Sequence, residues 1–465
     1  MESKRVGVVI PVFNTDSALV RECVESVLKQ SYREIEICLV NDGSTDKECL
    51  ELLKKFARAD VRVSVIHKEY NGGISECRNV GVEWFAGSYA CEVENPSTRE
   101  ALYGFRVKGE NPYKITRLHK SKKAFAKGAF EFGGGGFIAP KIDYILFLDS
   151  DDVWKENLVW ECLKRANGVD VVWFNHLPIY EIEASHIAYK ALGESQLLDK
   201  EGVISGRDWI DFVAQSDDIE KSMTFVWRVL IDFRYLSHIG LKFANQCFME
   251  DNLYGALLLY QADRIYTLPQ KLIYYRVRKN SETNHTRERK NVGIPSFLEG
   301  LCEKFYGNRA LTREVWVCMS CYVMKLHTQD FVKENASKYG IGILDAHLTK
   351  RFREIYLNFL YKESDLDTDY YLINCFNLIL FLSENYKRFR PFDNLEKAFC
   401  VDDKKQKGVT QLLYDVVLYE NNIVLGRNKI IKELEERIKA LEEENSELYL
   451  KTLQNDFHQN LKVFR

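Results

Sequence analysis

Apolar runs and amphipathic stretches alternate along the first third of the chain. Val6–Val12 is a continuous apolar run, typical of a strand covered on both faces. Residues 16–30 place their apolar side chains on one helical face, and the apolar residues of 35–39 alternate as in a second strand. Repeated strand–helix–strand units predict an α/β domain with a mostly parallel, Rossmann-like sheet and flanking helices. The remaining predicted elements are strands at 61–65, 144–148 and 169–174 and helices at 45–56, 74–85 and 252–260.

One connection in this pattern is unusually long and runs from residue 86 to residue 141. Loops of this length are usually functional or fold separately, so we expect an insertion in the α/β domain. Its positive charges predict a basic patch, which is either a solvated surface or a contact with an anionic lipid surface or acceptor. The patch consists of Lys114, Arg117, Lys120, Lys122, Lys123 and Lys127.

The later part of the chain has a mostly helical pattern and no recognisable chemical motif. We expect an α/β domain at 1–285, a helical C-terminal domain at 286–425 and a coiled-coil tail at 426–465. In the tail, apolar residues recur every three or four positions with one Asn among them, which favours a parallel two-stranded coil. A homodimer through 428–452 is therefore predicted, with a helix packed on its own chain as the alternative. The repeating positions are Ile431, Leu434, Ile438, Leu441, Asn445 and Leu448.

Composition and charge narrow the classes of function. The 465 residues carry 65 Lys and Arg against 68 Asp and Glu, so no nucleic-acid partner is indicated. The 12 cysteines show no metal-binding spacing and are expected to be reduced thiols. The N-terminal apolar run is too short for a signal peptide, and the run at 370–382 is too short to span a membrane. These features predict a cytoplasmic protein, which the basic insertion would bring to the inner face of the plasma membrane.

Polar clusters follow three of the predicted strands, where ligands bind in parallel sheets. These clusters are residues 41–44, 71–73 and 149–152. Asp149 and Asp151 follow a buried strand and are separated by one residue, which suits a Mg²⁺ or Mn²⁺ ion that also binds two phosphates. An acidic turn without a ligand is the alternative.

Three further polar residues each allow two interpretations. Asp42 either accepts a hydrogen bond from a nucleotide base or stabilises a turn. Arg78 either neutralises a diphosphate or is a charge on a helix surface. Asp251 begins a predicted helix, where an acidic side chain also favours the helix dipole, so its position alone does not indicate catalysis.

These motifs and their order resemble those of family 2 glycosyltransferases. The resemblance covers residues 4–82 and 142–176 and continues more weakly to 285. The insertion at 86–141 departs from the family pattern, in which the Arg-Asn helix leads almost directly to the acidic strand. The matching motifs are Ile10-Pro11-Val12-Phe13-Asn14, Val40-Asn41-Asp42-Gly43-Ser44-Thr45-Asp46, Gly72-Gly73-Ile74-Ser75 with Arg78-Asn79, and Leu146-Phe147-Leu148-Asp149-Ser150-Asp151-Asp152.

The resemblance implies a GT-A fold and an inverting transferase that uses a nucleotide-diphosphate sugar, most often UDP-linked. It implies that Pro11, Asn14 and Asp42 line the uridine pocket. Arg78 would lie near the base and the diphosphate.

The resemblance also implies roles for five residues in the reaction. Asp149 would face the ribose or the metal, and Asp151 would be the main ligand of Mn²⁺ or Mg²⁺. Asp251 would be the catalytic base, while Arg276 and Arg278 would close over the diphosphate. This assignment agrees with the chemistry, because the attacking hydroxyl needs a base and the leaving diphosphate needs its charge neutralised.

The sequence thus predicts a hexosyltransferase that acts on a glycan or lipid-linked acceptor in bacterial surface-glycan synthesis, such as that of lipopolysaccharide or capsule. One alternative is a catalytically degenerate GT-A scaffold that acts through its coiled coil. A sugar-phosphate nucleotidyltransferase would carry a Gly-rich loop with an Arg after the first strand, where this chain has Pro11-Val12-Phe13-Asn14. No Walker-type phosphate loop supports ATP hydrolysis.

Overall fold

A computed structural model describes most of the first 359 residues. The chain divides into two compact units, Met1–Thr410 and Gln411–Arg465, and every described residue lies in the first. The predicted coiled-coil tail and its dimer contact at 428–452 lie outside the described residues, so both stay predictions, as does the domain boundary at 285. The described residues are 3–94, 101–126, 132–133, 136–137, 139–181, 195–216, 225–278, 294–304, 307 and 309–359.

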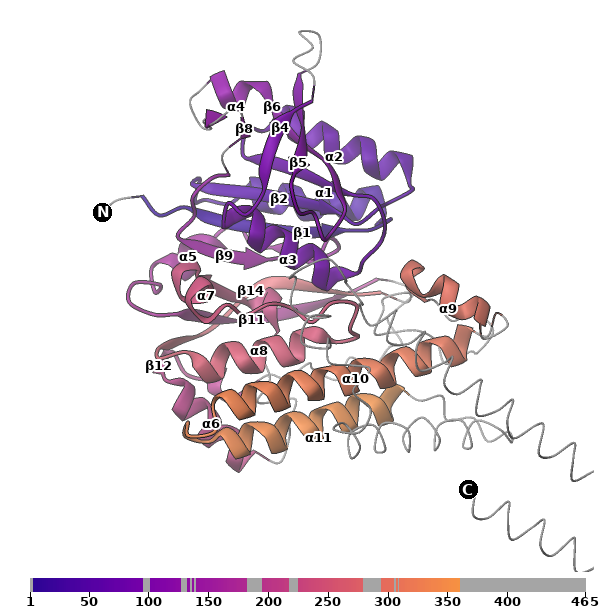
Figure 1. Ribbon diagram of the computed structural model, residues 1–465. Coiled ribbons are helices and arrows are strands. Elements are labelled where there is room, and N and C mark those ends of the chain that lie inside the picture. Colours follow the sequence, from indigo (N-terminus) through magenta and orange to yellow (C-terminus); the bar gives the residue numbers. More distant parts are fainter. Residues whose placement is uncertain are drawn as a thin grey trace, which may run out of the picture. The chain divides into compact units, whose positions relative to one another are not determined.

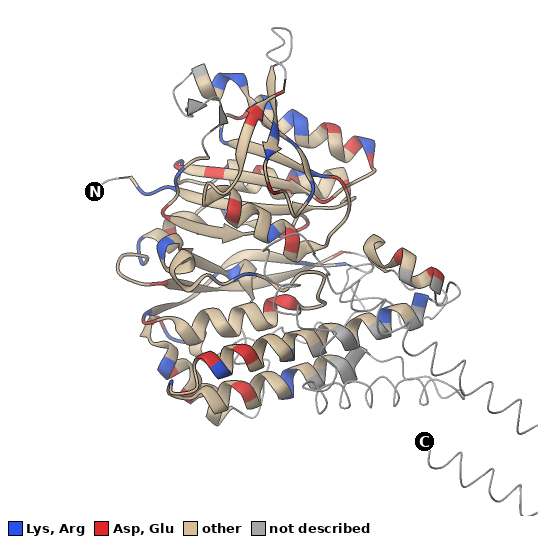
Figure 2. Ribbon diagram, in the orientation of Figure 1, with Lys and Arg blue, Asp and Glu red and all other residues tan. Residues whose placement is uncertain are grey.

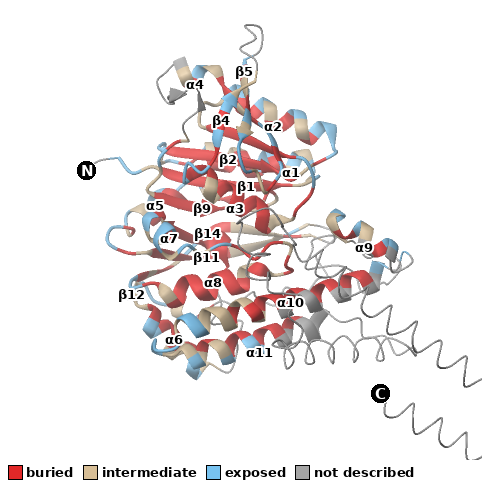
Figure 3. Ribbon diagram, in the orientation of Figure 1, coloured by how far each residue is buried: buried red, intermediate tan, exposed pale blue. Residues whose placement is uncertain are grey.

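Four parallel strands form the centre of the sheet (Figure 1). β1 (Val6–Val12) lies between β2 (Ile35–Asn41) and β9 (Tyr144–Phe147), and β2 also pairs with β3 (Val63–Lys68). All residues of these strands are buried, as Figure 3 shows for β1, β2 and β9. The predicted α/β fold is therefore confirmed, and the apolar runs are the buried strands. The crossover helices are α1 (Ser17–Leu28), α2 (Lys47–Ala59) and α3 (Ile74–Phe85).

The sheet as a whole is mixed, so the prediction of a mostly parallel sheet is correct only for its centre. β13 (Val229–Asp232) is antiparallel to β9 and to β11 (Val171–Tyr180), whereas β11 is parallel to β14 (Ile265–Val277). The short helix η4 (Val226–Arg228) directly precedes β13. The other elements of this half are β10 (Val153–Trp154), β12 (Gly202–Ile204), η2 (Gln196–Leu198), α5 (Leu158–Leu163), α6 (Gly206–Gln215), α7 (Phe233–Ile239) and α8 (Glu250–Gln261).

The insertion extends the sheet beyond β3. β6 (Ile115–Ser121) pairs antiparallel with β3, and β5 (Leu102–Lys108) pairs antiparallel with β6. An edge that would otherwise expose unpaired backbone groups is thereby covered. The remaining pieces are β4 (Ala90–Val93), β7 (Phe132–Gly133), β8 (Gly136–Phe137) and α4 (Lys122–Ala126).

The predicted basic patch of the insertion is smaller than its sequence indicates. Lys120 is buried, where its Nζ donates to Ser64 Oγ at 3.1 Å and lies 3.5 Å from Glu36 Oε2. Arg117 forms an ion pair with Glu94, and Figure 2 shows acidic positions among the basic ones in this part of the fold. The inclusion of Lys120 in a surface patch was therefore wrong, and Lys127 lies outside the described residues.

Helices follow the α/β sheet, as predicted. α9 (Glu299–Lys304) and η6 (Ser296–Leu298) precede the long helices α10 (Arg309–Glu334) and α11 (Ile341–Phe359). α10 and α11 pack against each other and against α8, on the side of the sheet that Figure 1 shows below β11. Within the described part of the chain, no helix is both long and apolar enough to cross a membrane.

Candidate active site

An acidic turn follows β9, at the carboxyl end of the parallel strands. Asp152 Oδ1 accepts a hydrogen bond from Arg276 N at 2.7 Å, and Asp151 Oδ2 accepts one from Arg278 Nη2 at 2.6 Å. Burial raises the pKa of Asp151, although Arg278 opposes this effect, and burial together with the neighbouring Asp151 and Asp149 raises the pKa of Asp152. The buried strand therefore holds several carboxylates close together in an environment that disfavours their ionised form.

Arg276 and Arg278 approach this turn from the end of β14. Arg276 Nε donates to Asp151 O at 2.8 Å, and its Nη2 reaches Glu22 Oε2 at 2.6 Å. Both arginines thus lie at the acidic turn. They would have to lie there in order to close over a diphosphate. Their contact with a diphosphate stays a prediction.

Arg78 is buried between two carboxylates. Its Nη2 donates to Asp149 Oδ1 at 2.8 Å and its Nη1 to Glu250 Oε1 at 2.5 Å, and the arginine side chain is 2% exposed. The alternative that Arg78 is a helix-surface charge is therefore wrong. Through this arginine, the acidic turn after β9 and the first turn of α8 are joined.

Asp251 lies beside Glu250 in that first turn and is only partly exposed. Its Oδ1 accepts a hydrogen bond from Asn252 Nδ2 at 3.1 Å. Burial raises the pKa of Asp251, whereas Arg78 and Arg351 lower it. A partly exposed carboxylate with a raised pKa has the properties of a proton acceptor, and a helix-start acid with no further role remains the alternative.

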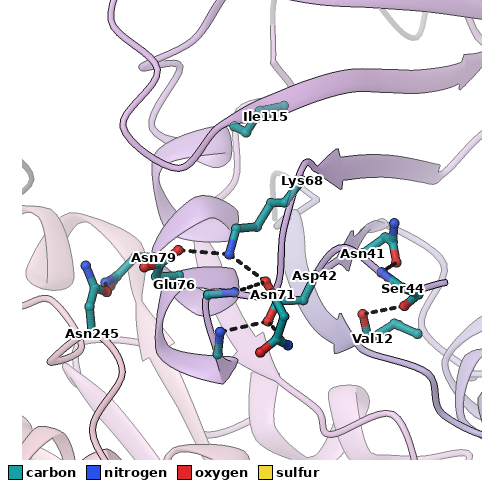
Figure 4. Close-up of polar contacts among 12 residues, drawn as sticks. Val12, Asn41, Asp42, Ser44, Lys68, Asn71, Glu76, Asn79, Ile115 and Asn245 are labelled. Atoms are coloured by element: carbon teal, nitrogen blue, oxygen red, sulfur yellow. Dashed lines mark hydrogen bonds and ion pairs between the residues drawn. The ribbon is translucent and has the colours of Figure 1, made fainter. Parts of the chain in front are cut away.

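Asp42 is surrounded by donors of its own chain, as Figure 4 shows. One carboxylate oxygen accepts from Lys68 Nζ at 2.5 Å and Gly72 N at 3.0 Å, and the other from Asn71 Nδ2 at 2.9 Å and Gly73 N at 2.8 Å. Two carboxylate oxygens offer about four lone-pair sites, and four donors occupy them. Asp42 therefore stabilises the turn before α3, which was the alternative, and hydrogen bonding to a base would require one donor to move.

The other two residues predicted for the uridine pocket lie close by. Pro11 is buried in β1, opposite Val40 of β2. Asn14 is exposed after β1 and has a positive φ of 44°, a left-handed conformation that Asn tolerates. Its Oδ1 accepts from Thr45 N at 2.9 Å and Asp46 N at 3.0 Å, which joins the ends of β1 and β2.

Three residues that sequence reasoning did not select support this site. Glu250 shares Arg78 with Asp149, and Asn252 contacts Asp251. Asn79 clamps α3 to the segment before α8, because its amide exchanges hydrogen bonds with the backbone of Phe243 at 2.9 and 3.0 Å. The adjacent pairs Arg78-Asn79 and Glu250-Asp251 were the only local signs of this arrangement.

The acidic turn suits a divalent cation by its chemistry. Asp149 and Asp151 offer hard carboxylate oxygens, and Asp152 Oδ2 is buried with no hydrogen-bond partner among the described residues. A cation would relieve the repulsion among these acids. Over the described ranges, no group of three or more His, Cys, Asp or Glu residues forms a metal cage. Water and phosphate oxygens would therefore complete the coordination of Mg²⁺ or Mn²⁺.

Comparison with known proteins finds a family match for the N-terminal part of the chain. Residues 7–93 match the family model described as "Glycosyl transferase family 2". The chain is 44% identical over 93 residues to "Glycosyltransferase GlyG" of Streptococcus pneumoniae, covering 20% of this chain and 30% of that protein. It is 28% identical over 182 residues to "Uncharacterized glycosyltransferase EpsJ" of Bacillus subtilis, covering 38% of this chain and 48% of that protein. Residues 7–93 are therefore similar to glycosyltransferase family 2.

The matches span less than half the length of these two relatives. Among solved structures, Staphylococcus aureus TarS 1–349 in complex with UDP-GlcNAc is 15% identical, with a TM-score of 0.47 and coverage of 81% of this chain and 80% of that chain. The similarity to the Pyrobaculum calidifontis mannosyltransferase PcManGT, in complex with GDP-Man and Mn²⁺, is lower, at 12% identity and a TM-score of 0.39, and covers 85% of this chain and 84% of that one.

Proposed function

We propose that the protein is an inverting glycosyltransferase that moves a hexose from a nucleotide-diphosphate sugar, UDP-linked by preference, to an acceptor hydroxyl. The observation that most supports this proposal is the bridge that Arg78 makes between Asp149 and Glu250. It holds the acidic turn after β9 and the first turn of α8 in one place, so a metal-binding and a proton-accepting group serve the same substrate.

The donor half of the site is built from the ends of β1, β2, β3 and β9. Pro11 and Asn14 would line the pocket for uridine, and Asp42 would contact the base once one of its four donors has moved. Asp149 and Asp151 would hold Mn²⁺ or Mg²⁺, which neutralises the charge of the departing diphosphate when bound. Arg276 and Arg278 already lie against the acidic turn and would contact the diphosphate as it binds.

The acceptor half supplies the base. Asp251 accepts the proton of the attacking hydroxyl while the bond from the anomeric carbon to the diphosphate oxygen breaks. The raised pKa of this carboxyl makes it a stronger base than an exposed aspartate. Alignment of the two substrates by the fixed walls of the site contributes further to the rate.

The acceptor is proposed to be a glycan or a lipid-linked sugar of the bacterial cell surface. The exposed basic residues of the insertion, among them Lys114 and Lys123, would bring the protein to an anionic membrane face. A homodimer through 428–452 belongs to the same proposal and rests on the heptad pattern alone.

The alternative function is a scaffold with an inactive transferase domain. Such a scaffold has no need for Asp149 and Glu250 to share one buried arginine, with Asp151 and Asp251 beside them in the sequence. The presence of these acids therefore favours the enzyme.

Measuring nucleotide release tests the proposal. The purified chain is incubated with Mn²⁺ and UDP-glucose, UDP-galactose, UDP-N-acetylglucosamine or GDP-mannose, and the released diphosphate is quantified. We expect turnover of a UDP-sugar, and a loss of about 10²- to 10⁴-fold in kcat for Asp251→Asn. Asp345→Asn, on α11, is the control with unchanged turnover. Absence of release from every donor would contradict the proposal.

A further inference from the structure

The first turn of α8 starts from an unfavourable backbone. Gln246 and Met249, in the segment that leads into the helix, have positive φ values of 57° and 55°. Non-glycine residues in this region cost about 1 kcal/mol or more each and persist only where their surroundings hold them. Met249 is also the N-cap residue of this helix, but its side chain makes no capping hydrogen bond to a backbone amide. Contacts from other elements must therefore fix the position of the first turn of α8, which carries Asp251.

Helix α10 supplies the first of these contacts. Trp316 Nε1 donates to Gln246 O at 2.7 Å, and Phe248 N donates to Ser320 Oγ at 2.9 Å. Trp316 and Ser320 are buried and four residues apart, so they share one face of the helix. The segment before Asp251 is thus bound to α10 at two points.

Helix α11 supplies the contact nearest to the carboxylate. Arg351 Nε donates to Asn252 Oδ1 at 2.9 Å, and Asn252 Nδ2 donates to Met249 O at 3.0 Å and to Asp251 Oδ1 at 3.1 Å. Arg351 is 2% exposed and Asn252 is fully buried. Because an arginine only donates, the amide oxygen must face Arg351, and the amide NH₂ must face Asp251. Arg351 therefore determines the orientation of the donor that holds the carboxylate.

We propose that Arg351 and Asn252 are positioning residues for Asp251, and that the helical region after residue 286 is thereby part of the active site. The inference rests on the proposed role of Asp251 as the base. Asn252 occupies Oδ1, and among the described residues no hydrogen bond or ion pair reaches Oδ2. Oδ2 is then the oxygen that takes the proton, and its direction is set by Arg351 through Asn252.

The consequence is a specific effect on the chemical step. Misplacing a catalytic group by about 1 Å can cost roughly 10²-fold in rate without weakening donor binding. The donor half is built on β1, β2, β3 and β9, whereas Arg351 belongs to α11, which packs against α8. Loss of Arg351 should therefore lower kcat and leave KM for the donor unchanged.

Steady-state release of UDP from the UDP-sugar that the wild type uses, with Mn²⁺ and water as acceptor, tests this proposal. We expect Arg351→Gln to lower kcat about ten- to hundredfold with KM changed by less than about twofold. Arg351→Lys should restore part of kcat, because it keeps a donor at this place. Lys325→Gln is the control, since it removes an ion pair of 2.5 Å between α10 and Asp345 of α11 without touching α8.

Asn252→Asp provides a second variant of the same shape. It keeps an acceptor for Arg351 but replaces the NH₂ that faces Asp251 with an oxygen, so kcat should fall as far as in Arg351→Gln. If Arg351→Gln does not fold, this variant decides the matter alone. Unchanged kcat in the folded variants, or a fall equal to that of Lys325→Gln, overturns the proposal. A wild type that releases no diphosphate contradicts the proposed function itself, and this inference with it.

Discussion

Arg278 Nη2 lies 2.6 Å from Asp151 Oδ2, so a cation of the chain itself occupies the carboxylate proposed as the main metal ligand. The two side chains are 29% and 16% exposed, which places the pair between a surface and a buried ion pair. A divalent ion bound at Asp151 as proposed would compete with Arg278, which would then become available to a diphosphate.

This relationship predicts opposite effects of one substitution. Arg278→Ala should bind Mn²⁺ more tightly in the absence of nucleotide, by about 1 kcal/mol or roughly fivefold in Kd. The same variant should turn over the donor more slowly, because a positive charge at the diphosphate is lost. Electron paramagnetic resonance of free Mn²⁺ measures the first effect. Weaker Mn²⁺ binding would contradict the displacement, and Arg165→Ala, at a pair remote from the turn, is the control.

Removal of Arg78 should destabilise the fold strongly. Arg78→Met leaves Asp149 and Glu250 without their shared cation, and breaking a buried pair in this way costs about 3–5 kcal/mol. Urea unfolding measures the change in the free energy of unfolding. Lys29→Met removes an exposed pair with Glu25 and should leave the free energy of unfolding nearly unchanged. Equal costs for the two variants would show that the Arg78 bridge is not structural.

A histidine pair in the sheet predicts a loss of stability in acid. Asn41 Nδ2 lies 3.2 Å from His67 Nδ1 and can only donate to it, so His67 Nε2 donates to His119 Nδ1 at 3.1 Å. Burial lowers the pKa of His67 to about 3 and that of His119 to about 4, from 6.5. Below pH 6.5 the unfolded chain gains protons that the folded chain does not, so stability falls as the pH drops toward 4.

His119→Gln should reduce this dependence. Chemical unfolding at several pH values between 7 and 4.5 should show a shallower fall in the free energy of unfolding than for the wild type. His238→Gln, at an exposed histidine of α7, should leave the fall unchanged. An identical slope in the wild type and His119→Gln would contradict the assigned burial effect.

Close packing of a helix start predicts the effect of a single methyl group. A Cβ at Gly206 would lie 2.6 Å from the carbonyl oxygens of Leu259 and Tyr260, which belong to the backbone and cannot rotate away. Gly206→Ala should cost about 1–3 kcal/mol in the free energy of unfolding. A Cβ at Gly202 meets no atom within 4 Å, so Gly202→Ala is the matched control. Equal stability of the two variants by urea unfolding would show that α6 shifts freely.

The centre of the fold could be predicted from the sequence because its strands are buried on both faces. Val6–Val12 is apolar throughout, and such runs identify parallel strands without any knowledge of their partners. The strands of the insertion gave no such sign. In Leu102–Lys108 only two of the seven residues are buried, so this strand has no apolar run that would distinguish it from a loop in the sequence.

The candidate site was predictable where its residues are close in sequence. Asp149 and Asp151 share one turn, and Arg78 follows the glycines that open α3. The contact of Arg351 with Asn252 joins residues 99 positions apart, and no local pattern marks either residue. The hydrogen bonds that Asp42 accepts could not be predicted from the sequence either. One of them comes from Lys68, whose side chain reaches the turn from the neighbouring strand.

The most direct test of the account is nucleotide binding at the acidic turn. Thermal unfolding is measured with UDP and with the UDP-sugars, with and without Mn²⁺, for the wild type, Asp151→Ala and Asp143→Ala. Asp143 precedes the opposite end of β9 and is the control. A ligand at 100 times its Kd adds about 2.7 kcal/mol of stability, which a melting curve resolves easily. We predict stabilisation by UDP that requires Mn²⁺, is lost in Asp151→Ala and persists in Asp143→Ala. Stabilisation that is equal in Asp151→Ala, or absent with every nucleotide, would contradict a metal-dependent donor site at this turn.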